Sequence, residues 1–352
     1  MSGDAVGPVR VVHATAPVRV CDIGGWTDTW FARHGHVCSI AVEPGVTVRA
    51  AAYPRGTRPH AVVDAVDYGD RLVLGPGRPV PVRHRLLGAV IEEAALPDDL
   101  AVELSVTSGV PPGCATGTSA AVAVALLGAL DRLTATRRTP AEIARAAHRV
   151  EVERLGLQSG VQDQLAAAHG GINHIEVIDY PDARVRPLPL DDEIRSQLER
   201  RLLLVYLGRA HHSSTVHDHV VAGLAGEGPG SPRLDVLRRC AERAVEALGR
   251  GDLAALGRVM NDSTDGQAAL HPSVVSDDAR RVIAMAEANR ALGCKVNGAG
   301  GDGGSVTVLC GVGADARRTL AGAFEEIEGA SVIPVRLSAH GLRCHDRGRR
   351  RP

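Results

Sequence analysis

The sequence predicts a two-layer α+β fold, because segments patterned as strands and segments patterned as helices are interleaved along its 352 residues. Hydrophobic residues make up 44% of the chain but aromatic residues only 2%, so we expect a core of Ala, Val and Leu. The 40 Gly and 20 Pro are spread along the chain, which indicates many turns. A single domain typically has about 150 residues. We therefore expect the 352 residues to form one large domain or two closely associated ones.

The first half of the chain begins with strands and continues into helices. VRVVHAT and VCSIAVEPGVTVRAAAY, within the first sixty or so residues, are rich in β-branched residues, which favours strands. Residues 84–95 have helical spacing of apolar residues, and 100–108 alternate as a strand does. A turn rich in Gly and Pro over 109–117 precedes an apolar helix through residue 130. Pro140, at a first helical position, opens another helix.

The second half contains the remaining strands and most of the helical sequence. We expect a strand pair around IEVIDY and ARVRPLPL, and a buried strand over 201–208. A helical region with a polar linker at 226–233 follows. A glycine-rich loop at 298–304 then precedes a strand, and ADARRTLAGAFEEIEG is expected to be the last helix. The basic residues 341–352 are expected to be disordered, with a phosphate-binding arm as the alternative.

Charge and cysteine content exclude several classes of partner. Lys and Arg number 40 and Asp and Glu 41, so there is no basic excess to bind nucleic acid or an anionic membrane. The only lysine is Lys295. The N-terminus lacks a secretion signal, no stretch of about 20 apolar residues occurs, and seven irregularly spaced cysteines fit neither a disulfide framework nor a zinc site. We therefore expect a cytoplasmic protein.

The loop at 109–117 and the helix after it have features of a phosphate-binding site. Small residues from Pro112 to Ala121 allow backbone amides to point toward one position, and the helix start adds unpaired N–H groups and a positive dipole end. No lysine follows Gly117, so this is not the P-loop, and a metal or another segment must neutralise charge. Thr118 and Ser119 are placed to reach a metal. An ordinary turn before a buried helix is the alternative.

A second glycine-rich run and an acidic pair complete the candidate site. GAGGDGG at Gly298–Gly304 suits backbone that closes on a ligand, or a plain loop between two elements. Glu151 and Asp163 are twelve residues apart with glycines between them, so the chain can leave a helix and return. One carboxylate could hold Mg²⁺ while the other accepts a proton from a substrate hydroxyl. Solvated acidic side chains on a helix surface are the alternative.

Three motifs in order resemble the GHMP small-molecule kinases, the family of galactokinase, homoserine kinase, mevalonate kinase and phosphomevalonate kinase. PPGCATGTSAA resembles the signature P-x-x-G-L-G-S-S-A-A, APVRVCDIGGWTDTW the N-terminal motif, and KVNGAGGDGGSVTVL the C-terminal motif. The resemblance covers roughly residues 10 to 335. GGWTDT and LGLQSGVQDQLAAAHGGIN are most similar to the fucokinase and heptose 7-phosphate kinase branch.

This resemblance implies a GHMP kinase fold, with an N-terminal ATP-binding domain over 1–185 and a ferredoxin-like C-terminal domain over 186–340. ATP and Mg²⁺ are the implied cofactors, and the protein is expected to be a monomer or homodimer. Asp163 matches the catalytic base, Arg19 the arginine near the transferred phosphate, and Glu151 and Ser119 the Mg²⁺ ligands. The remaining matches are the ATP-binding residues Pro112, Gly113, Cys114, Ala115, Thr116, Gly117, Thr118 and Ser119, and the acceptor-binding residues Gly24, Gly25, Trp26, Thr27, Asp28, Gly298, Gly300 and Gly301.

Two features depart from this pattern or lie outside it. Asp302 adds a carboxylate to a loop that is normally neutral, where it would repel phosphate unless it points away or meets an arginine. After the strand at 201–208, Arg209, Ser213 and Ser214 could hold the phosphate of a sugar phosphate, although a solvated helix start fits equally well. Zinc at the neighbouring histidines, His211, His212, His217 and His219, lacks a nearby Cys or carboxylate to complete a site.

The sequence therefore predicts an ATP-dependent kinase that phosphorylates a hydroxyl, the anomeric one, of a sugar or sugar phosphate resembling heptose 7-phosphate or an octose phosphate. Fucose and a cyclitol phosphate of a secondary-metabolite pathway are alternative acceptors. A non-catalytic GHMP-like regulator is the alternative class, but a pure binder would have no need of the base Asp163. A decarboxylase of the mevalonate branch is a more distant alternative.

Overall fold

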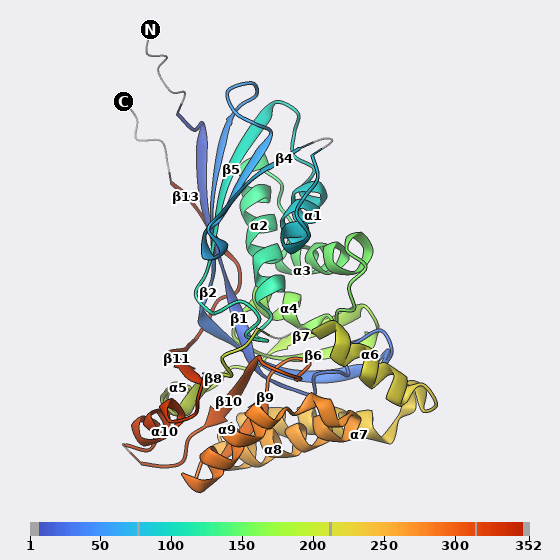
Figure 1. The fold of residues 1–352 in the computed structure, drawn as a ribbon, viewed down its shortest axis with the longest axis vertical. Helices are drawn as coiled ribbons and strands as arrows, with labels where there is room; N and C mark the ends of the chain where they lie inside the picture. Colours follow the sequence, from blue (N-terminus) through green and yellow to red (C-terminus); the bar gives the residue numbers. More distant parts are fainter. Residues whose placement is uncertain (1–6, 76–77, 211–212, 314, 348–352) are drawn as a thin grey trace.

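Two β-sheets with helices packed against them make up the fold (Figure 1). The computed structural model of the protein describes residues 7–75, 78–210, 213–313 and 315–347, with the side chains of 213–215 and 347 left outside the description. In these residues the larger sheet has nine strands and the smaller sheet four. The interleaved helices and strands confirm the α+β fold expected from the sequence.

The larger sheet is built around two long strands, β1 (Arg10–Ile23) and β2 (Gly35–Pro54). Its main order is β13-β1-β2-β5-β3-β4, and it is antiparallel except where β3 runs parallel to β5. The length of β2 lets it pair with β5 at one end and with β6 at the other. The remaining strands are β3 (Ala61–Ala65), β4 (Asp70–Leu74), β5 (Leu100–Ser108), β6 (Ile172–Asp179), β7 (Asp182–Pro187), β12 (Arg336–Leu337) and β13 (Arg343–Arg347).

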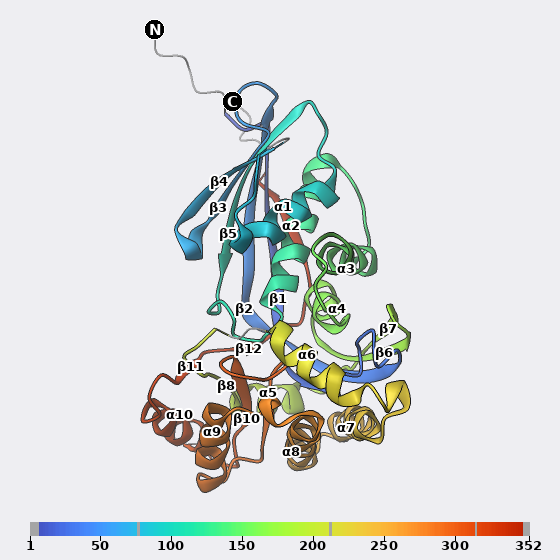
Figure 2. The same ribbon diagram turned by 45° about the vertical axis from the view of Figure 1, so that its right-hand side comes forward.

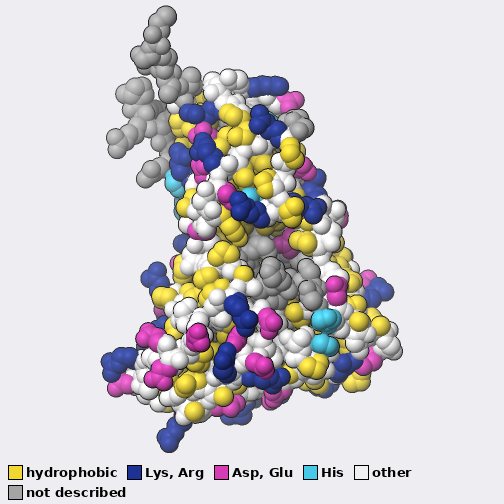
Figure 3. All heavy atoms as spheres, viewed as in Figure 1, with side chains coloured by type: hydrophobic (Ala, Val, Ile, Leu, Met, Phe, Trp, Pro, Cys, Tyr) yellow, Lys and Arg dark blue, Asp and Glu magenta, His cyan; other side chains and the backbone are white. Residues whose placement is uncertain are grey.

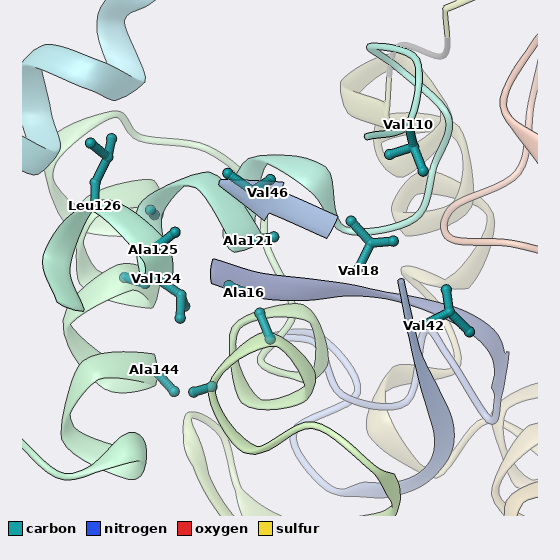
Figure 4. Packing of buried hydrophobic residues seen from close by; sticks show 14 of the residues in the cluster. Ala16, Val18, Val42, Val46, Val110, Ala121, Val124, Ala125, Leu126 and Ala144 are labelled. Carbon is teal, nitrogen blue, oxygen red and sulfur yellow. The ribbon is translucent and has the colours of Figure 1, made fainter. Parts of the chain in front are cut away.

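Four helices cover one side of this sheet in Figure 1: α1 (Arg85–Ala94), α2 (Thr118–Thr134), α3 (Pro140–Arg149) and α4 (Gln162–His169). The helix α2 is buried along most of its length, and Figure 4 shows its small side chains between β1 and α3. Such side chains let the backbones approach closely, which suits a core with few aromatic residues. Thr139 forms a capping box with Glu142, so α3 begins at Pro140 as predicted.

In Figures 1 and 2 the smaller sheet lies at the lower end of the long strands β1 and β2. It is antiparallel with the order β11-β8-β10-β9, which is the strand arrangement of a ferredoxin-like fold, as expected. Its strands are β8 (Leu202–Tyr206), β9 (Gly293–Val296), β10 (Ser305–Leu309) and β11 (Ser331–Ile333). The helices of this part are α5 (Asp192–Arg201), α6 (Ser213–Leu224), α7 (Pro232–Gly249), α8 (Leu253–Leu270), α9 (Asp277–Ala288) and α10 (Ala316–Glu325).

The C-terminal segment differs from the expected disorder of 341–352. Residues 343–347 form β13, which pairs with β1 from Thr15 to Val11 along an edge that would otherwise be open. Asp346 adds ion pairs of 3.1 Å to Arg10 and Arg132. Residues 348–352 lie outside the described part of the chain. The domain boundary proposed at 185/186 falls within β7, close to the connection between the two sheets.

The surface carries charges of both signs. On the face shown in Figure 3, Lys and Arg are interspersed with Asp and Glu, in agreement with a formal net charge of -1. Within the described ranges, no helix combines the length and the apolar character needed to cross a bilayer.

Candidate active site

The loop between β5 and α2 leaves the first turn of α2 open to a ligand. Gly113, Ala115 and Gly117 have positive φ angles of 70°, 58° and 69°, which place the loop in left-handed conformations. No side chain caps the N-terminus of α2, so its first N–H groups and positive dipole end are available to an anion. This is the geometry that phosphate binding requires.

A cavity of about 280 Å³ lies beside this loop. Of the predicted ATP-binding residues, Pro112, Gly113, Thr118 and Ser119 line it. The other lining residues include the aromatic or apolar side chains of Tyr68, His84, Leu86, Leu87, Val106 and Val122, together with the polar residues Asp67, Arg83 and Ser108. A polar loop beside an apolar wall suits a nucleotide, with the phosphates at the loop and the base against the wall.

The other loop residues hold the loop in place. Cys114 and Thr116 are fully buried, and their carbonyls accept hydrogen bonds from Ser305 Oγ (2.6 Å) and the Arg19 backbone N–H (3.0 Å). The carbonyl of Ala115 accepts a bond of 2.6 Å from the Arg19 guanidinium. These contacts tie the loop both to β1 and to the smaller sheet.

Arg19 and Asp163, the two predicted catalytic residues, form an ion pair. Arg19 lies on β1 and Asp163 in the first turn of α4, and Nε of Arg19 donates to Oδ1 of Asp163 over 2.8 Å. A second bond joins Nη2 to Oδ2 over 3.3 Å. Burial by itself lowers the pKa of Arg19, but the carboxylates of Asp163 and Asp22 outweigh it and raise that pKa above its usual value. Arg19 is therefore a fixed positive charge.

A second, smaller cavity of about 50 Å³ lies next to this ion pair. Four segments enclose it: the N-terminal motif, the start of α4 with the residues before it, α6 and the C-terminal glycine-rich loop. Its lining residues are Arg19, Trp26, Asp28, Thr29, Gly160, Gln162, Asp163, His217, Gly298 and Ala299. The predicted base therefore faces the cavity that an acceptor hydroxyl would enter.

Asp28 is the carboxylate of the N-terminal motif that lines this cavity. It is 1% exposed, and its Oδ2 accepts a hydrogen bond of 3.1 Å from the backbone N–H of Gln162. Burial raises the pKa of Asp28 to about 6, with the nearby Asp163 and Asp22 acting in the same direction. Gly160 lets this carboxylate come close, because a Cβ at position 160 would lie 2.1 Å from Asp28 Oδ2.

The neighbouring residues of this motif shape the turn. Gly24 has φ +90°, and a Cβ there would lie 2.1 Å from the carbonyl oxygen of His36. The hydroxyl of Thr27 donates to the Gly24 carbonyl over 2.8 Å. Trp26 lines the cavity, whereas Gly24, Gly25 and Thr27 are not among its lining residues. The last three are thus positioned to support Trp26 and Asp28.

Glu151, a predicted Mg²⁺ ligand, lies on a π-helical turn that continues α3 over Val150–Arg154. Its Oε2 accepts bonds of 2.7 Å from both Ser159 Oγ and Gln164 Nε2, while its buried Oε1 has no hydrogen-bond partner. Burial raises the pKa of Glu151 to about 7, and Ser159 and Ser119 act against this rise. An unpartnered carboxylate oxygen close to the Ser119 hydroxyl fits a hard cation that also contacts phosphate.

The C-terminal glycine-rich loop contributes Gly298 to the acceptor cavity. The Gly298 N–H donates to both carboxylate oxygens of Asp22, over 3.2 and 3.1 Å. Gly300 and Gly301 pack instead against Val274, whose carbonyl accepts a 2.8 Å bond from the Gly301 N–H. Asp302 is exposed and acts electrostatically on Arg209, whose ion pair is with Asp278.

Arg209 lies apart from the acceptor cavity. Its guanidinium is paired with Asp278 of α9, and 61% of its side chain is exposed. His211 and His212 lie outside the described residues, as do the side chains of Ser213 and Ser214. Among the described residues, no group of three or more His, Cys, Asp or Glu side chains is arranged to hold a metal, so zinc gains no support.

Sequence reasoning missed a buried pair behind Arg19. Asp22 and Lys295 are both 0% exposed, and Lys295 Nζ lies 3.6 Å from Asp22 Oδ1. Lys295 Nζ also donates to Gln267 Oε1 over 2.9 Å and to the Val296 carbonyl. The available signal was compositional, since this is the single lysine in a chain that otherwise uses arginine. Gln162 and His217, which line the acceptor cavity, were also not assigned to the site.

Comparisons with known proteins identify the family of the chain. A profile of the GHMP kinases N terminal domain matches residues 84–171. The chain is 29% identical over 204 residues to the D-glycero-alpha-D-manno-heptose 7-phosphate kinase of Campylobacter jejuni, covering 58% of this chain and 60% of that protein. It is 32% identical over 269 residues to the mevalonate kinase of Thermococcus sibiricus, covering 74% of this chain and 73% of that protein.

A solved structure shows the same fold over nearly the whole chain. The D-glycero-D-manno-heptose 1-phosphate kinase from Bacteriodes thetaiotaomicron superposes with a TM-score of 0.73 at 19% identity, covering 95% of this chain and 98% of that one. The chain belongs to the GHMP kinase family. The expected enzyme class, a phosphotransferase with an alcohol group as acceptor, is confirmed at the level of this family.

Proposed function

We propose that the protein transfers the γ-phosphoryl group of ATP to a hydroxyl, the anomeric one, of a sugar or sugar phosphate. The supporting observation is the Arg19–Asp163 ion pair, which lies between the open first turn of α2 and the cavity that contains Asp28. A phosphate donor and a hydroxyl acceptor would meet at this pair. The identity with a heptose 7-phosphate kinase supports a sugar as the acceptor.

In this reaction the residues mainly position the two substrates and compensate the charge that develops during transfer. The acceptor oxygen forms a bond to the γ-phosphorus, the bond to the β-phosphate oxygen breaks, and ADP leaves. Asp163 orients the acceptor hydroxyl and accepts its proton, while Arg19 offsets the charge that develops on the transferred group. Asp28 holds neighbouring hydroxyls of the acceptor, and the amides at the start of α2 hold the phosphates.

Glu151 and Ser119 are the residues that would hold Mg²⁺. The unpartnered Glu151 Oε1 and the adjacent hydroxyl are oxygen ligands of the kind that Mg²⁺ prefers. When bound, the ion supplies positive charge to the phosphates. This role explains how the site works without the lysine of a P-loop, because Lys295 is engaged elsewhere.

Turnover of MgATP with a panel of free and phosphorylated sugars, followed by ³¹P NMR of the product, tests this proposal. Asp163→Asn should lower kcat by about 10²–10⁴-fold with little change in the KM for ATP, because the base is lost while the loop before α2 is intact. Glu153→Gln is the matched control, since Glu153 is exposed and lies on the same turn as Glu151. ATP binding without turnover on any sugar would instead favour the alternative class, a non-catalytic GHMP-like regulator.

A further inference from the structure

Three residues that line the acceptor cavity carry buried polar atoms without a hydrogen-bond partner: Trp26 Nε1, Gln162 Oε1 and His217 Nδ1. The side chains are 3%, 7% and 9% exposed, respectively. Buried polar groups in folded proteins are nearly always paired, because an unpaired group loses its bonds to water without replacement. Three unpaired atoms around one cavity indicate that a ligand supplies their partners.

The chemistry of these atoms defines what the ligand must offer. An indole N–H only donates, and an amide oxygen only accepts. Nδ1 of the His217 ring has no hydrogen-bond partner, and the backbone of Gln158 interacts with the same ring. In a neutral imidazole one ring nitrogen donates and the other accepts. Burial lowers the pKa of His217, which favours this neutral form despite the nearby Asp218 and Asp163. The cavity thus offers the indole N–H as a donor, the amide oxygen as an acceptor and the unpaired imidazole nitrogen of His217.

The carboxylate of Asp28 adds further acceptor capacity to the same cavity. Hydroxyl groups match this set, because each donates one hydrogen bond and accepts others. A phosphate is a poor match, since it mainly accepts and would face the amide and carboxylate oxygens. The polar lining therefore favours the hydroxyls of a polyol.

The positive charges near the cavity are already paired with carboxylates of the protein. Arg19 is the only cationic side chain among the described lining residues, and it is bound to Asp163 and lies 3.8 Å from Asp22. Arg209 is paired with Asp278 outside the cavity. A second phosphate on the acceptor would find no free guanidinium among these residues.

Aromatic packing fixes the two rings that carry the free nitrogens. The chain has only two Trp and two Phe, yet Trp26, Trp30 and Phe31 lie within six residues. The ring of His217 packs edge-on against Trp26 and Trp30, with centroid distances of 4.9 and 5.8 Å. This cluster holds Trp26 and His217 in place before the acceptor arrives, which reduces the entropy lost on binding.

We propose that Trp26, Gln162 and His217, together with Asp28, select an uncharged polyhydroxylated ring, a free sugar or free cyclitol, as the acceptor. This inference rests on the proposed kinase function and narrows its substrate class. It replaces Arg209 as the expected specificity determinant with neutral hydrogen-bonding groups.

Steady-state kinetics of the full chain with MgATP test the selection. The acceptors are L-fucose, D-glycero-D-manno-heptose and the 7-phosphate of that heptose. We expect kcat/KM for the free heptose to exceed that for its 7-phosphate by at least about 10-fold. The reverse preference would overturn the proposal.

Variants then separate recognition from stability. Trp26→Phe and His217→Phe each keep a ring but lose the nitrogen, so each should raise the KM of the free sugar by roughly 5- to 10-fold and leave the KM for ATP unchanged. His217→Gln should recover part of the loss, because its amide oxygen can accept. His219→Phe is the matched control, since His219 lies on the same helix as His217 but is exposed and is not among the cavity residues. Unchanged KM values in both Phe variants would reject the inference while leaving the kinase function intact.

A binding measurement without turnover keeps the two proposals distinguishable. In the Trp30→Phe variant, Trp26 is the single tryptophan, so its fluorescence reports on the acceptor cavity directly. A saturable change with the free sugars supports the inference even if no acceptor is phosphorylated. A change with the 7-phosphate alone, or no change with any of the three, would overturn it.

Discussion

Two fully buried charged residues, Asp22 and Lys295, lie behind Arg19. Asp22 accepts the Gly298 N–H and faces both Lys295 and Arg19, so it connects the C-terminal glycine-rich loop to the Arg19–Asp163 pair. Neither Lys295 nor Asp22 is among the residues that line the acceptor cavity. The pair therefore supports the position of Arg19 and Gly298 from outside the cavity.

We expect strong coupling between these two residues. Lys295→Met leaves the Asp22 carboxylate buried with only Arg19 at 3.8 Å to compensate it, and should cost about 3 kcal/mol or more in the free energy of unfolding. The double variant Asp22→Asn/Lys295→Met removes both charges and should cost clearly less than the sum of the single changes. Urea unfolding of the four proteins measures this, and additive losses would show that the pair is not coupled.

Asp28 should make the stability of the free protein depend on pH. The pKa of Asp28 is about 6 in the fold and about 4 in an unfolded chain, so the folded state holds the extra proton between these values. Stability from this group is therefore present below about pH 4 and is lost as pH rises through about 6, by up to about 3 kcal/mol. In thermal melts, Asp28→Asn should gain stability relative to the parent from pH 4 to pH 7.

The control for this pH series is Asp179→Asn. Asp179 is 65% exposed and paired with Arg33 at the surface, so its difference from the parent should stay nearly constant over the same range. A parent and an Asp28→Asn variant with parallel pH profiles would show that burial does not perturb this carboxyl.

Sequence motifs predicted the residues that we propose contact the reacting groups better than those behind them. Arg19, Asp28, Glu151 and Asp163 each stand in a recognisable motif, and the structure brings them to one site. The contribution of His217 depends on α6 crossing the cavity 191 positions after Trp26, which local sequence cannot specify. Lys295 stands out because it is the only lysine of the sequence, but that observation does not predict that its partner is Asp22.

Helix α2 and its preceding loop depend on a glycine with no room for a side chain. Gly117 has φ +69°, and a Cβ there would lie 3.0 Å from Cγ of Asp163. Gly117→Ala should therefore displace the base and lower kcat by about 10-fold or more, in addition to a backbone cost of about 1 kcal/mol.

Gly156→Ala separates the two effects. Gly156 has nearly the same φ, +67°, but a Cβ there would meet no atom within 4 Å. Both variants should lose similar stability in thermal melts, whereas only Gly117→Ala should lose kcat. Equal kcat values would contradict a close approach between this glycine and Asp163.

Element boundaries were predictable where local signals are strong. The strand at 100–108 and the start of α3 at Pro140 agree with the structure, because alternation and a capping box act over a few residues. The π-helical turn at Val150–Arg154 was not predicted, since the sequence reads as a continuing helix. It accompanies the inward position of Glu151, which is 5% exposed, while Glu153 faces solvent.

For the whole molecule, the C-terminal segment should contribute to stability. Besides the β13–β1 pairing, Leu342 packs against Gly128 of α2, where a Cβ would lie 2.4 Å from Leu342 Cδ2. Deletion of residues 342–352 should remove both contacts and lower Tm by several degrees. Deletion of residues 348–352 alone keeps both contacts and is the control, and equal Tm values for the two truncations would contradict this role.

The order of the motifs predicted the overall organisation of the chain, but it did not predict the path of the C-terminal segment. Composition of 341–352 is polar and basic, and such composition indicates disorder when no partner is considered. The partner is the edge of β1, more than 300 residues earlier, and a pairing over that distance has no local signature.

The pairing of β13 with β1 also sets an order of events during synthesis on the ribosome. Strand β1 ends at Ile23 and β13 begins at Arg343, so at about 5–20 residues per second the nascent chain exposes one edge of β1 for roughly 15 to 60 seconds. An unpaired edge rich in β-branched residues is a template for association with other chains. We expect the yield of folded enzyme to depend on how chaperones and growth temperature protect that edge during translation, even where the finished protein is stable.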